Sequence, residues 1–330
     1  MRALLESAHN FRAILVDLLR MRPDSRLLVI SDTHTQSVAL AYVAREVGAS
    51  IGLEATLALM DPVVHEGGEP PPCVAAAMKE ADLVLEFAET RNTIHSAAHR
   101  DALASGARHY VWNTDVSRAF ADQPLSAFGL EETRKTTEEL SARLTQADTA
   151  RLATTCGTDL TMSLKGRSGI PIHPTSDARS GGLPFYAEAA IAPVEGTTEG
   201  TAVVDASVRG WGYVLRIPIR FEVVKGKAQI QSISSSTAQA EQLRRLLQLD
   251  ENAVNCAAEL GIGCSAFPSK ILRGDFSSDY AMAGNVHIAF GANDSIGGNV
   301  HSCIHNDLLM TDATLSLDSA CVVKLGTLLI

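Results

Sequence analysis

The feature that most constrains the fold is an alternation of short apolar runs and helical patterns in the first third of the chain. Apolar runs occupy residues 26–32, 51–60, 81–88 and 108–113, and helical patterns lie between them at 37–47, 72–80 and 94–105. Strands joined by helices of about three turns predict right-handed crossovers and a parallel sheet covered on both faces. A charged helical pattern at 130–146 follows. We therefore expect an α/β domain with a parallel sheet over residues 1–148.

The sequence changes character after Ala147. Strand-like alternation separated by glycine turns is found at 151–155, 159–165, 200–208, 214–224 and 228–233. Gly226-Lys227 is typical of a hairpin loop. Helical patterns are predicted only at 237–249 and 251–260. These patterns indicate a second domain, residues 149–330, of mixed α+β and mostly antiparallel structure.

Composition and charge exclude several classes of function. The formal net charge of -10 argues against broad binding to nucleic acid or an anionic membrane. Residues 1–20 contain Glu6 and Asp17, so they predict neither a signal peptide nor a membrane span, and a cytoplasmic location is the expectation. The six cysteines form no Cys-x-x-Cys pair, which favours free thiols over a zinc ribbon. No Gly-x-Gly-x-x-Gly follows the first strand, so a dinucleotide site is not expected.

Residues 284–307 carry the strongest chemical signal. His287 lies in a short apolar run that predicts a strand, a loop rich in glycine and asparagine follows, and His305 and Asp307 stand two residues apart. If that last run is extended, His305 and Asp307 share one face of a strand. Imidazole and carboxylate together suit zinc, cobalt, manganese or iron(II). The sequence thus predicts a metal site near the C-terminus.

Two further acids lie in apolar surroundings of the second domain. Glu188 is followed by Ala-Ala-Ile, and Glu259 is flanked by Ala258 and Leu260. An acid in such surroundings is costly to bury unpaired, so a metal ion, an arginine or several donors should accompany it. For His287 the alternative is a core histidine with satisfied hydrogen bonds.

Four sequence blocks together resemble the successive site motifs of metallo-aminopeptidases of the aminopeptidase T and aminopeptidase S type. The blocks are Ala187-Glu-Ala-Ala-Ile-Ala-Pro-Val-Glu-Gly-Thr, Ala258-Glu-Leu-Gly-Ile-Gly, Gly284-Asn-Val-His-Ile-Ala-Phe-Gly and Ser302-Cys-Ile-His-Asn-Asp-Leu. They cover most of residues 180–318 in order. The first domain resembles this family only in its general α/β pattern.

The resemblance implies a pair of divalent metal ions, zinc, cobalt or manganese, held by Glu188, Glu259, His287, His305 and Asp307. It implies hydrolysis of an amide or peptide bond by metal-activated water. Glu188 or Glu259 would carry the proton to the leaving amine, and the residues do not decide which of the two does so. The implied substrate is a small amide or short peptide, and the implied assembly is a homodimer.

The same scaffold is shared by the 2,5-dihydroxypyridine 5,6-dioxygenases, which the chain resembles across the same blocks. That resemblance implies an alternative: one iron(II) ion held by two histidines and one aspartate. The matching positions are Glu259, His305 and Asp307, so an acid stands in place of one histidine. A third alternative is a binding protein without activity on the same scaffold.

Two departures from the aminopeptidase pattern stand out. Asp294 occupies the position of a tyrosine that assists catalysis, and Asp279-Tyr280 replaces a Glu-Lys pair. These departures bear on peptide hydrolysis more than on metal binding. We expect the hydrolase, with the dioxygenase as the alternative.

Overall fold

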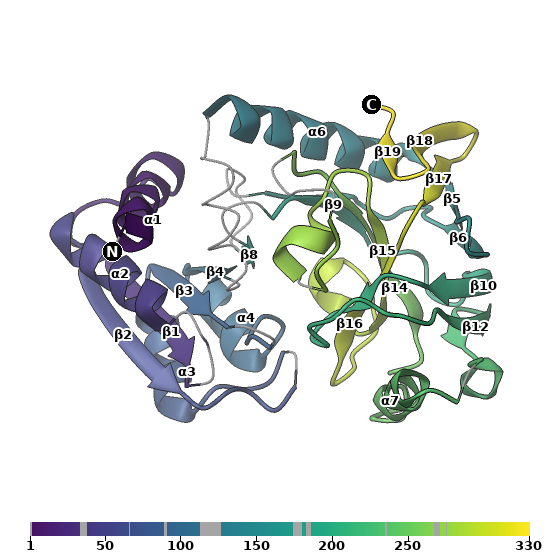
Figure 1. Ribbon diagram of the computed structural model, residues 1–330, viewed down its shortest axis with the longest axis horizontal. Helices are drawn as coiled ribbons and strands as arrows, with labels where there is room; N and C mark the ends of the chain where they lie inside the picture. The colour runs from purple at the N-terminus through teal and green to yellow at the C-terminus, as the bar shows by residue number, and fades with distance from the viewer. Residues whose placement is uncertain are drawn as a thin grey trace. The chain divides into compact units, whose positions relative to one another are not determined.

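The computed structural model describes residues 2–33, 38–65, 67–88, 91–112, 127–173, 180–182, 186–234, 236–266, 271–274 and 276–330. The chain divides into two compact units, one of residues 1–134 and 172–186, the other of residues 135–171 and 187–330 (Figure 1). Our predicted boundary at 148/149 differs in two ways. The C-terminal part of the helix at 127–146 belongs to the second unit, and residues 172–186 return to the first.

The first unit contains a parallel sheet with the strand order β2-β1-β3-β4-β8. Its strands are β1 (Arg26–Asp32), β2 (Glu54–Met60), β3 (Leu83–Phe87), β4 (Arg108–Trp112) and β8 (Ser180–Gly182). Its helices are α1 (Arg2–Ala13), the π-helix η1 (Ile14–Leu18), α2 (Val38–Ser50), α3 (Pro72–Glu80) and α4 (Ala97–Ala104). The predicted parallel α/β domain is confirmed. The alternation of apolar runs and helices located its first four strands.

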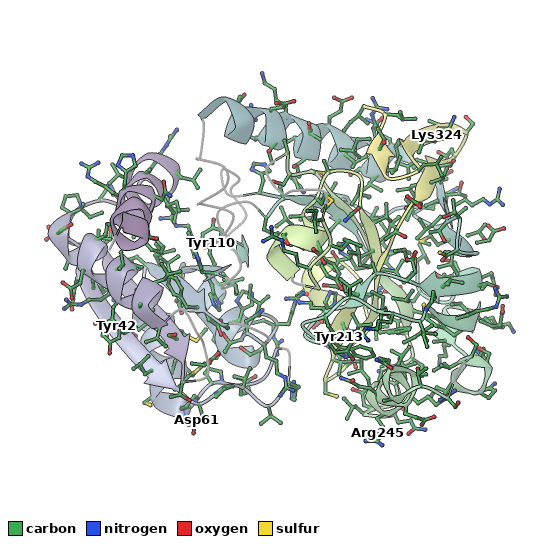
Figure 2. The ribbon with its side chains drawn as sticks, in the orientation of Figure 1. Tyr42, Asp61, Tyr110, Tyr213, Arg245 and Lys324 are labelled. Atoms are coloured by element: carbon green, nitrogen blue, oxygen red, sulfur yellow. The ribbon has the colours of Figure 1, made fainter. Side chains whose placement is uncertain are left out.

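Helices cover this sheet on two faces. The strands are continuous apolar runs, so both of their faces must be buried. Met78 of α3 and Ala102 of α4 pack against Ile30 of β1 in one buried cluster. On the other face, the Phe11 ring of α1 lies 4.7 Å from the Trp112 ring, centroid to centroid. Tyr110 is buried within the unit, whereas Tyr42 on α2 is 48% exposed (Figure 2).

The second unit contains two sheets whose strand pairings are mostly antiparallel. One sheet has the order β13-β12-β10-β6-β5-β17-β18-β19 and the other β11-β16-β15-β14-β9-β7. The strands of the first are β5 (Thr149–Ala153), β6 (Asp159–Ser163), β10 (Glu199–Val204), β12 (Ile219–Val224), β13 (Lys227–Ala228), β17 (Thr314–Leu317), β18 (Ala320–Lys324) and β19 (Thr327–Leu328). Those of the second are β7 (Ile170–Ile172), β9 (Glu188–Ile191), β11 (Ser207–Val208), β14 (Cys256–Gly263), β15 (Val286–Gly291) and β16 (His305–Met310).

The two sheets of this unit share one hydrophobic core. Phe221 of β12 and Phe290 of β15 lie with ring centroids 5.4 Å apart, and both side chains are fully buried. Leu140 and Leu144 of α6 (Ala127–Gln146) and Leu243 of α7 (Ala238–Leu246) belong to the same core. The mixed, mostly antiparallel second domain is thus confirmed.

Two sequence predictions of local structure are wrong. Residues 230–232, expected to continue a strand, form the 3₁₀ helix η2 (Ile230–Ser232). Residues 251–260, expected to be helical, instead lead into strand β14. Every residue of Cys256–Gly263 is buried, and β9 and β15 pair with the strand on its two sides, so tertiary burial overrides the helical propensity of Ala-Ala-Glu-Leu. No helix among the described residues is long and apolar enough to cross a membrane.

Candidate metal centre

Four adjacent strands of the six-stranded sheet carry the five predicted site residues. Glu188 lies on β9, Glu259 on β14, His287 on β15, and both His305 and Asp307 on β16. The register pairs Glu188 with Gly263, His287 with Gly261, and Asp307 with Ala289. Because directly paired residues of neighbouring strands point to the same face, this register brings the predicted acids and histidines together on one face.

The opposite face of the same strands builds the hydrophobic core. Leu260 pairs with Ile288, and Ile288 pairs with Leu308, and all three side chains are fully buried in the core. Alternation along each strand thus sends one set of residues to the core and the other to the site. A register shift between Cys256 and Leu260, with Ala257 at φ +53°, lies beside Glu259 in the only irregular part of the β14–β15 pairing.

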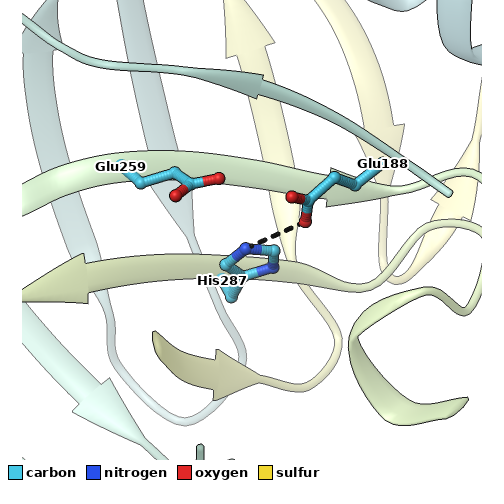
Figure 3. Close-up of side chains that lie close together, drawn as sticks. All are labelled: Glu188, Glu259 and His287. Atoms are coloured by element: carbon cyan, nitrogen blue, oxygen red, sulfur yellow. Dashed lines mark ion pairs between the residues drawn. The ribbon is translucent and has the colours of Figure 1, made fainter. Parts of the chain in front are cut away.

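The five side chains form two groups of three possible metal ligands, and Glu259 belongs to both. Glu188, Glu259 and His287 offer ligand atoms within 4.8 Å of one another, and so do Glu259, His305 and Asp307. All five are buried. Figure 3 shows Glu188 and Glu259 on the same side of the sheet as the His287 ring. Three carboxylates are therefore concentrated in a buried space with two imidazoles.

A glycine makes room for the first group. The Nε2 atom of His287 lies 3.3 Å from Oε2 of Glu188 (Figure 3). To reach it, the imidazole lies across Gly261 of the neighbouring strand. A Cβ atom at Gly261 would lie 2.2 Å from both Nε2 and Cε1 of His287. Gly261 is thus required by the approach of the ring and not by its own backbone angles.

The second group is centred on Nε2 of His305. This atom lies 2.9 Å from Oε2 of Glu259 and 3.2 Å from Oδ1 of Asp307. The other ring nitrogen, Nδ1, lies 2.7 Å from the carbonyl oxygen of Ala292. Since a carbonyl only accepts, Nδ1 donates, and this hydrogen bond fixes the ring with Nε2 toward the carboxylates. Metal-binding histidines are commonly oriented in this way.

Arg209, in the turn directly after the edge strand β11, completes the second group. Its Nη1 donates to Oδ2 of Asp307 at 2.9 Å, and the two side chains are 5% and 3% exposed. The pairing of β11 with β16 places Val208 opposite Leu308, and the backbone N–H of Arg209 donates to the carbonyl of Asp307 at 2.9 Å. The sequence analysis missed Arg209. Its only signal was a buried acid in need of a cationic partner.

The electrostatics of the site follow from burial and crowding. Burial opposes the charged form of His305, but Asp307 and Glu259 outweigh it and raise the pKa of the imidazole well above its ordinary value. Burial lowers the pKa of His287 despite the same acids. Burial also disfavours ionised Asp307, yet Arg209 and His305 hold the pKa of that carboxyl well below its usual range. The cluster therefore attracts positive charge.

The two departures from the aminopeptidase pattern lie outside both ligand groups. The Asp279 carboxylate accepts hydrogen bonds from the backbone N–H groups of Arg273 and Gly274. The Tyr280 hydroxyl donates to the carbonyl oxygen of Asp307 at 3.2 Å, and its ring contacts His287 edge-on with centroids 5.2 Å apart. Asp279 thus stabilises the backbone at residues 273–274, and Tyr280 contacts Asp307 and His287.

Asp294 lies on the short 3₁₀ helix η4 (Asp294–Ile296), in the connection between β15 and β16. Its Oδ2 lies 2.8 Å from Nδ1 of His301, a histidine whose side chain is 83% exposed. The residue is not part of either ligand group. An aspartate paired with an exposed histidine does not reproduce the tyrosine of the aminopeptidase pattern.

The donor set fits a divalent cation. Both ring nitrogens of His287 and Oδ1 of Asp307 are buried and make no hydrogen bond of good geometry with the described residues, although Nε2 of His287 and Oδ1 of Asp307 lie 3.3 and 3.2 Å from another member of the cluster. Buried polar atoms are normally satisfied, and an ion is a standard reason for exceptions. Carboxylate and imidazole donors suit iron(II), manganese, cobalt and zinc. Each group contains two acids and one histidine, so neither reproduces the two-histidine, one-carboxylate set of many iron oxygenases.

The fold and the site together define an enzyme scaffold with a buried cluster of carboxylates and histidines that could hold a metal ion. A sequence model of the 2,5-dihydroxypyridine 5,6-dioxygenase family (NicX) matches residues 11–330. The chain therefore belongs to this family. No curated protein matches it in sequence.

Two solved structures share the fold. A 2,5-dihydroxypyridine dioxygenase from Pseudomonas putida KT2440 has a TM-score of 0.79 and 18% identity, with 99% of this chain and 97% of that chain covered. Wild-type AmpT from Thermus thermophilus has a TM-score of 0.70 and 17% identity, with 99% of each chain covered. The expected scaffold is confirmed, while the assignment to the aminopeptidases is not. The comparisons support the dioxygenase alternative better than the hydrolase.

Proposed function

We propose that this protein is a ring-cleaving dioxygenase that uses one iron(II) ion and acts on a small hydroxylated heterocycle of the dihydroxypyridine class. The observation that carries the proposal is the family match over residues 11–330. The buried group of Glu259, His305 and Asp307 supports it, because these three residues match the ligand positions implied by the family resemblance. Glu259 in place of a histidine makes the group richer in oxygen donors, which suits a hard divalent ion.

Glu259, His305 and Asp307 would hold the iron, which when bound supplies the activation of dioxygen and of the hydroxylated ring. The protein contributes orientation. The Ala292 carbonyl holds His305 through Nδ1, and Arg209 holds Oδ2 of Asp307, so one donor atom of each residue is directed toward the shared space. The His305 and Glu259 side chains are 3% and 6% exposed, which keeps bulk water from these donors.

Glu188 and His287 would handle the proton of the substrate. They belong to the group that does not contain His305 and Asp307, and Oε2 of Glu188 lies 3.3 Å from Nε2 of His287. Burial lowers the pKa of His287, which favours the neutral imidazole, so Nε2 can accept a hydrogen bond from Glu188 once that carboxyl is protonated. We assign Oε2 of Glu188 to receive a ring hydroxyl proton, with His287 as its partner.

A second candidate function, metal-assisted hydrolysis of an amide bond, is favoured by one specific observation. Glu259 belongs to both three-donor groups, as a carboxylate that bridges two ions would. A pair of ions would supply an activated water, and Glu188 would carry its proton to the leaving amine. The five donors are sufficient for this alternative.

Oxygen consumption separates the two functions. Protein purified without oxygen and loaded with iron(II) is mixed with 2,5-dihydroxypyridine in an oxygen electrode. We expect one dioxygen consumed for each ring lost, and no loss of the ring without oxygen. Asp307→Asn should lose this activity, whereas Asp159→Asn, which changes a surface acid paired with Arg151, should retain it. Cleavage of small amides at equal rates with and without oxygen, and no oxygen uptake, would favour the hydrolase and overturn the first proposal.

A further inference from the structure

Arg209 does more than satisfy a buried acid. It is the only buried arginine whose side chain pairs with a member of either ligand group among the described residues. We propose that Arg209 is a positioning residue that sets the number of divalent ions at this centre to one, by holding Asp307 through one oxygen and by supplying a fixed positive charge. The inference rests on the proposed metal centre, and it specifies how that centre is filled.

The two oxygens of the Asp307 carboxylate contact different residues. Oδ2 accepts from Nη1 of Arg209 at 2.9 Å, while Oδ1 lies 3.2 Å from Nε2 of His305. The two oxygens therefore face different partners. With Oδ2 engaged, Asp307 offers a metal ion one oxygen, and it cannot readily bridge two ions through both.

The backbone of Arg209 is held beside Asp307 by hydrogen bonds of its own N–H and carbonyl groups. The N–H of Arg209 donates to the carbonyl of Asp307 at 2.9 Å, and Nδ2 of Asn306 donates to the carbonyl of Arg209 at 3.1 Å. Strand β11 pairs with β16 immediately before Arg209. Contacts on both sides of the residue fix its position relative to Asp307.

The summed charge of the ligand residues and Arg209 favours one divalent ion over two. Among the ligand residues and Arg209, the three acids supply three negative charges and Arg209 one positive charge, so these residues together carry two negative charges when both imidazoles are neutral, as metal ligation requires. One divalent ion balances this sum. A second would leave two uncompensated positive charges in a buried space, which is costly. Without Arg209 the sum would be three negative charges, and a second ion would be held more strongly.

Loss of Arg209 therefore has opposite consequences under two accounts. If the residue only supports the fold, its removal loosens Asp307 and weakens all metal binding. If it sets the ion count, its removal strengthens the binding of a second ion. The sign of the change separates a positioning role from a structural one.

The test is a titration of the full-length apoprotein with cobalt(II), followed by calorimetry and by the visible spectrum of the bound ion. We expect the wild type to bind one cobalt tightly and a second at least about a hundredfold more weakly. Arg209→Met should raise the affinity for the second ion about tenfold or more. Arg209→Lys keeps the charge and should retain one tight ion. Arg151→Met, which removes an exposed arginine paired with Asp159, is the control and should match the wild type.

Other outcomes are decisive as well. A second-ion affinity that is unchanged or lower in a folded Arg209→Met would overturn the inference. So would two tight ions in the wild type, although the metal centre itself would stand. No cobalt binding to the wild type would instead reject the proposed centre. If Arg209→Met does not fold, Arg209→Gln, which removes the charge and keeps a hydrogen-bond donor, is judged by the same criterion: an unchanged or lower affinity for the second ion would overturn the inference.

Discussion

Each unit of this protein buries a cluster of histidine and carboxylate side chains, and the two clusters differ in how their polar atoms are satisfied. In the first unit, Nδ1 of His99 lies 2.9 Å from Nδ1 of His109, and Nε2 of His109 lies 2.9 Å from Oε2 of Glu86. Thr93 donates to Glu86 through its N–H and its hydroxyl. One carboxylate thus meets several donors, and the network is closed.

The cluster of the second unit has the opposite balance. Three carboxylates surround two imidazoles, and Arg209 satisfies one oxygen of one carboxylate. Both ring nitrogens of His287 are without hydrogen bonds from the described residues. Both units bury histidine beside acid, so burial alone does not separate the two clusters. We expect the excess of acid over protein donors to distinguish the metal site.

The largest expected effects come from changing Glu259, which belongs to both ligand groups, and His305, which belongs to the second. Glu259→Ala and His305→Ala should each lower turnover about a thousandfold or more and reduce bound metal, while the fold is largely retained. The matched change in the closed network is Glu86→Gln, which should leave bound metal at the wild-type level. Turnover and elemental analysis are measured on the same samples. Wild-type activity in either ligand variant would reject the assignment of the site.

Gly261→Ala tests the space beside His287. The added Cβ would lie 2.2 Å from the imidazole, so the ring must move away from Glu188. Because His287 is assigned to proton handling, we expect turnover to fall about tenfold, with a loss of stability of about 1–3 kcal/mol. The double variant Gly261→Ala/His287→Ala should be no worse in turnover than His287→Ala alone. Additive losses would show that the glycine acts in some other way.

The smallest expected effect sharpens the other side of the comparison. Burial, helped by His109 and Arg100, lowers the pKa of His99 to about 3 from 6.5. Between about pH 6.5 and pH 3, His99 is protonated in the unfolded chain and neutral in the folded protein. The free energy of unfolding therefore falls as the pH drops through this range. Between pH 7 and pH 5 the loss is about 2 kcal/mol. Hydrogen exchange of amides in β3 and β4, corrected for intrinsic rates, should show this loss in the wild type and not in His99→Gln.

Much of the fold is predictable because hydrophobic periodicity is local. The apolar run at residues 26–32 became β1 over the same residues, and α3 spans 72–80 as expected. The predicted helix at 251–260 was wrong. Ala-Ala-Glu-Leu favours a helix in isolation, but pairing with β9 and β15 makes this segment part of strand β14. Strand identity beyond such segments depends on neighbours that are distant in sequence.

The five predicted site residues meet on one face, and their role as metal ligands remains a prediction. Their chemistry was visible because acids in apolar surroundings are costly. Arg209 and Gly261 were not visible. Each acts through the strand register, one opposite Asp307 and one under His287, and that register is set by pairings across the sheet.

The central claim is that the buried acids and histidines of the second unit bind a divalent metal ion. Anomalous X-ray scattering at the iron edge, on crystals of protein purified without oxygen, chelator or added metal, tests it most directly. The account predicts one strong peak within bonding distance of Glu259, His305 and Asp307. If elemental analysis finds iron in the same protein, crystals without anomalous density at these three side chains, or with the metal held elsewhere, would contradict it.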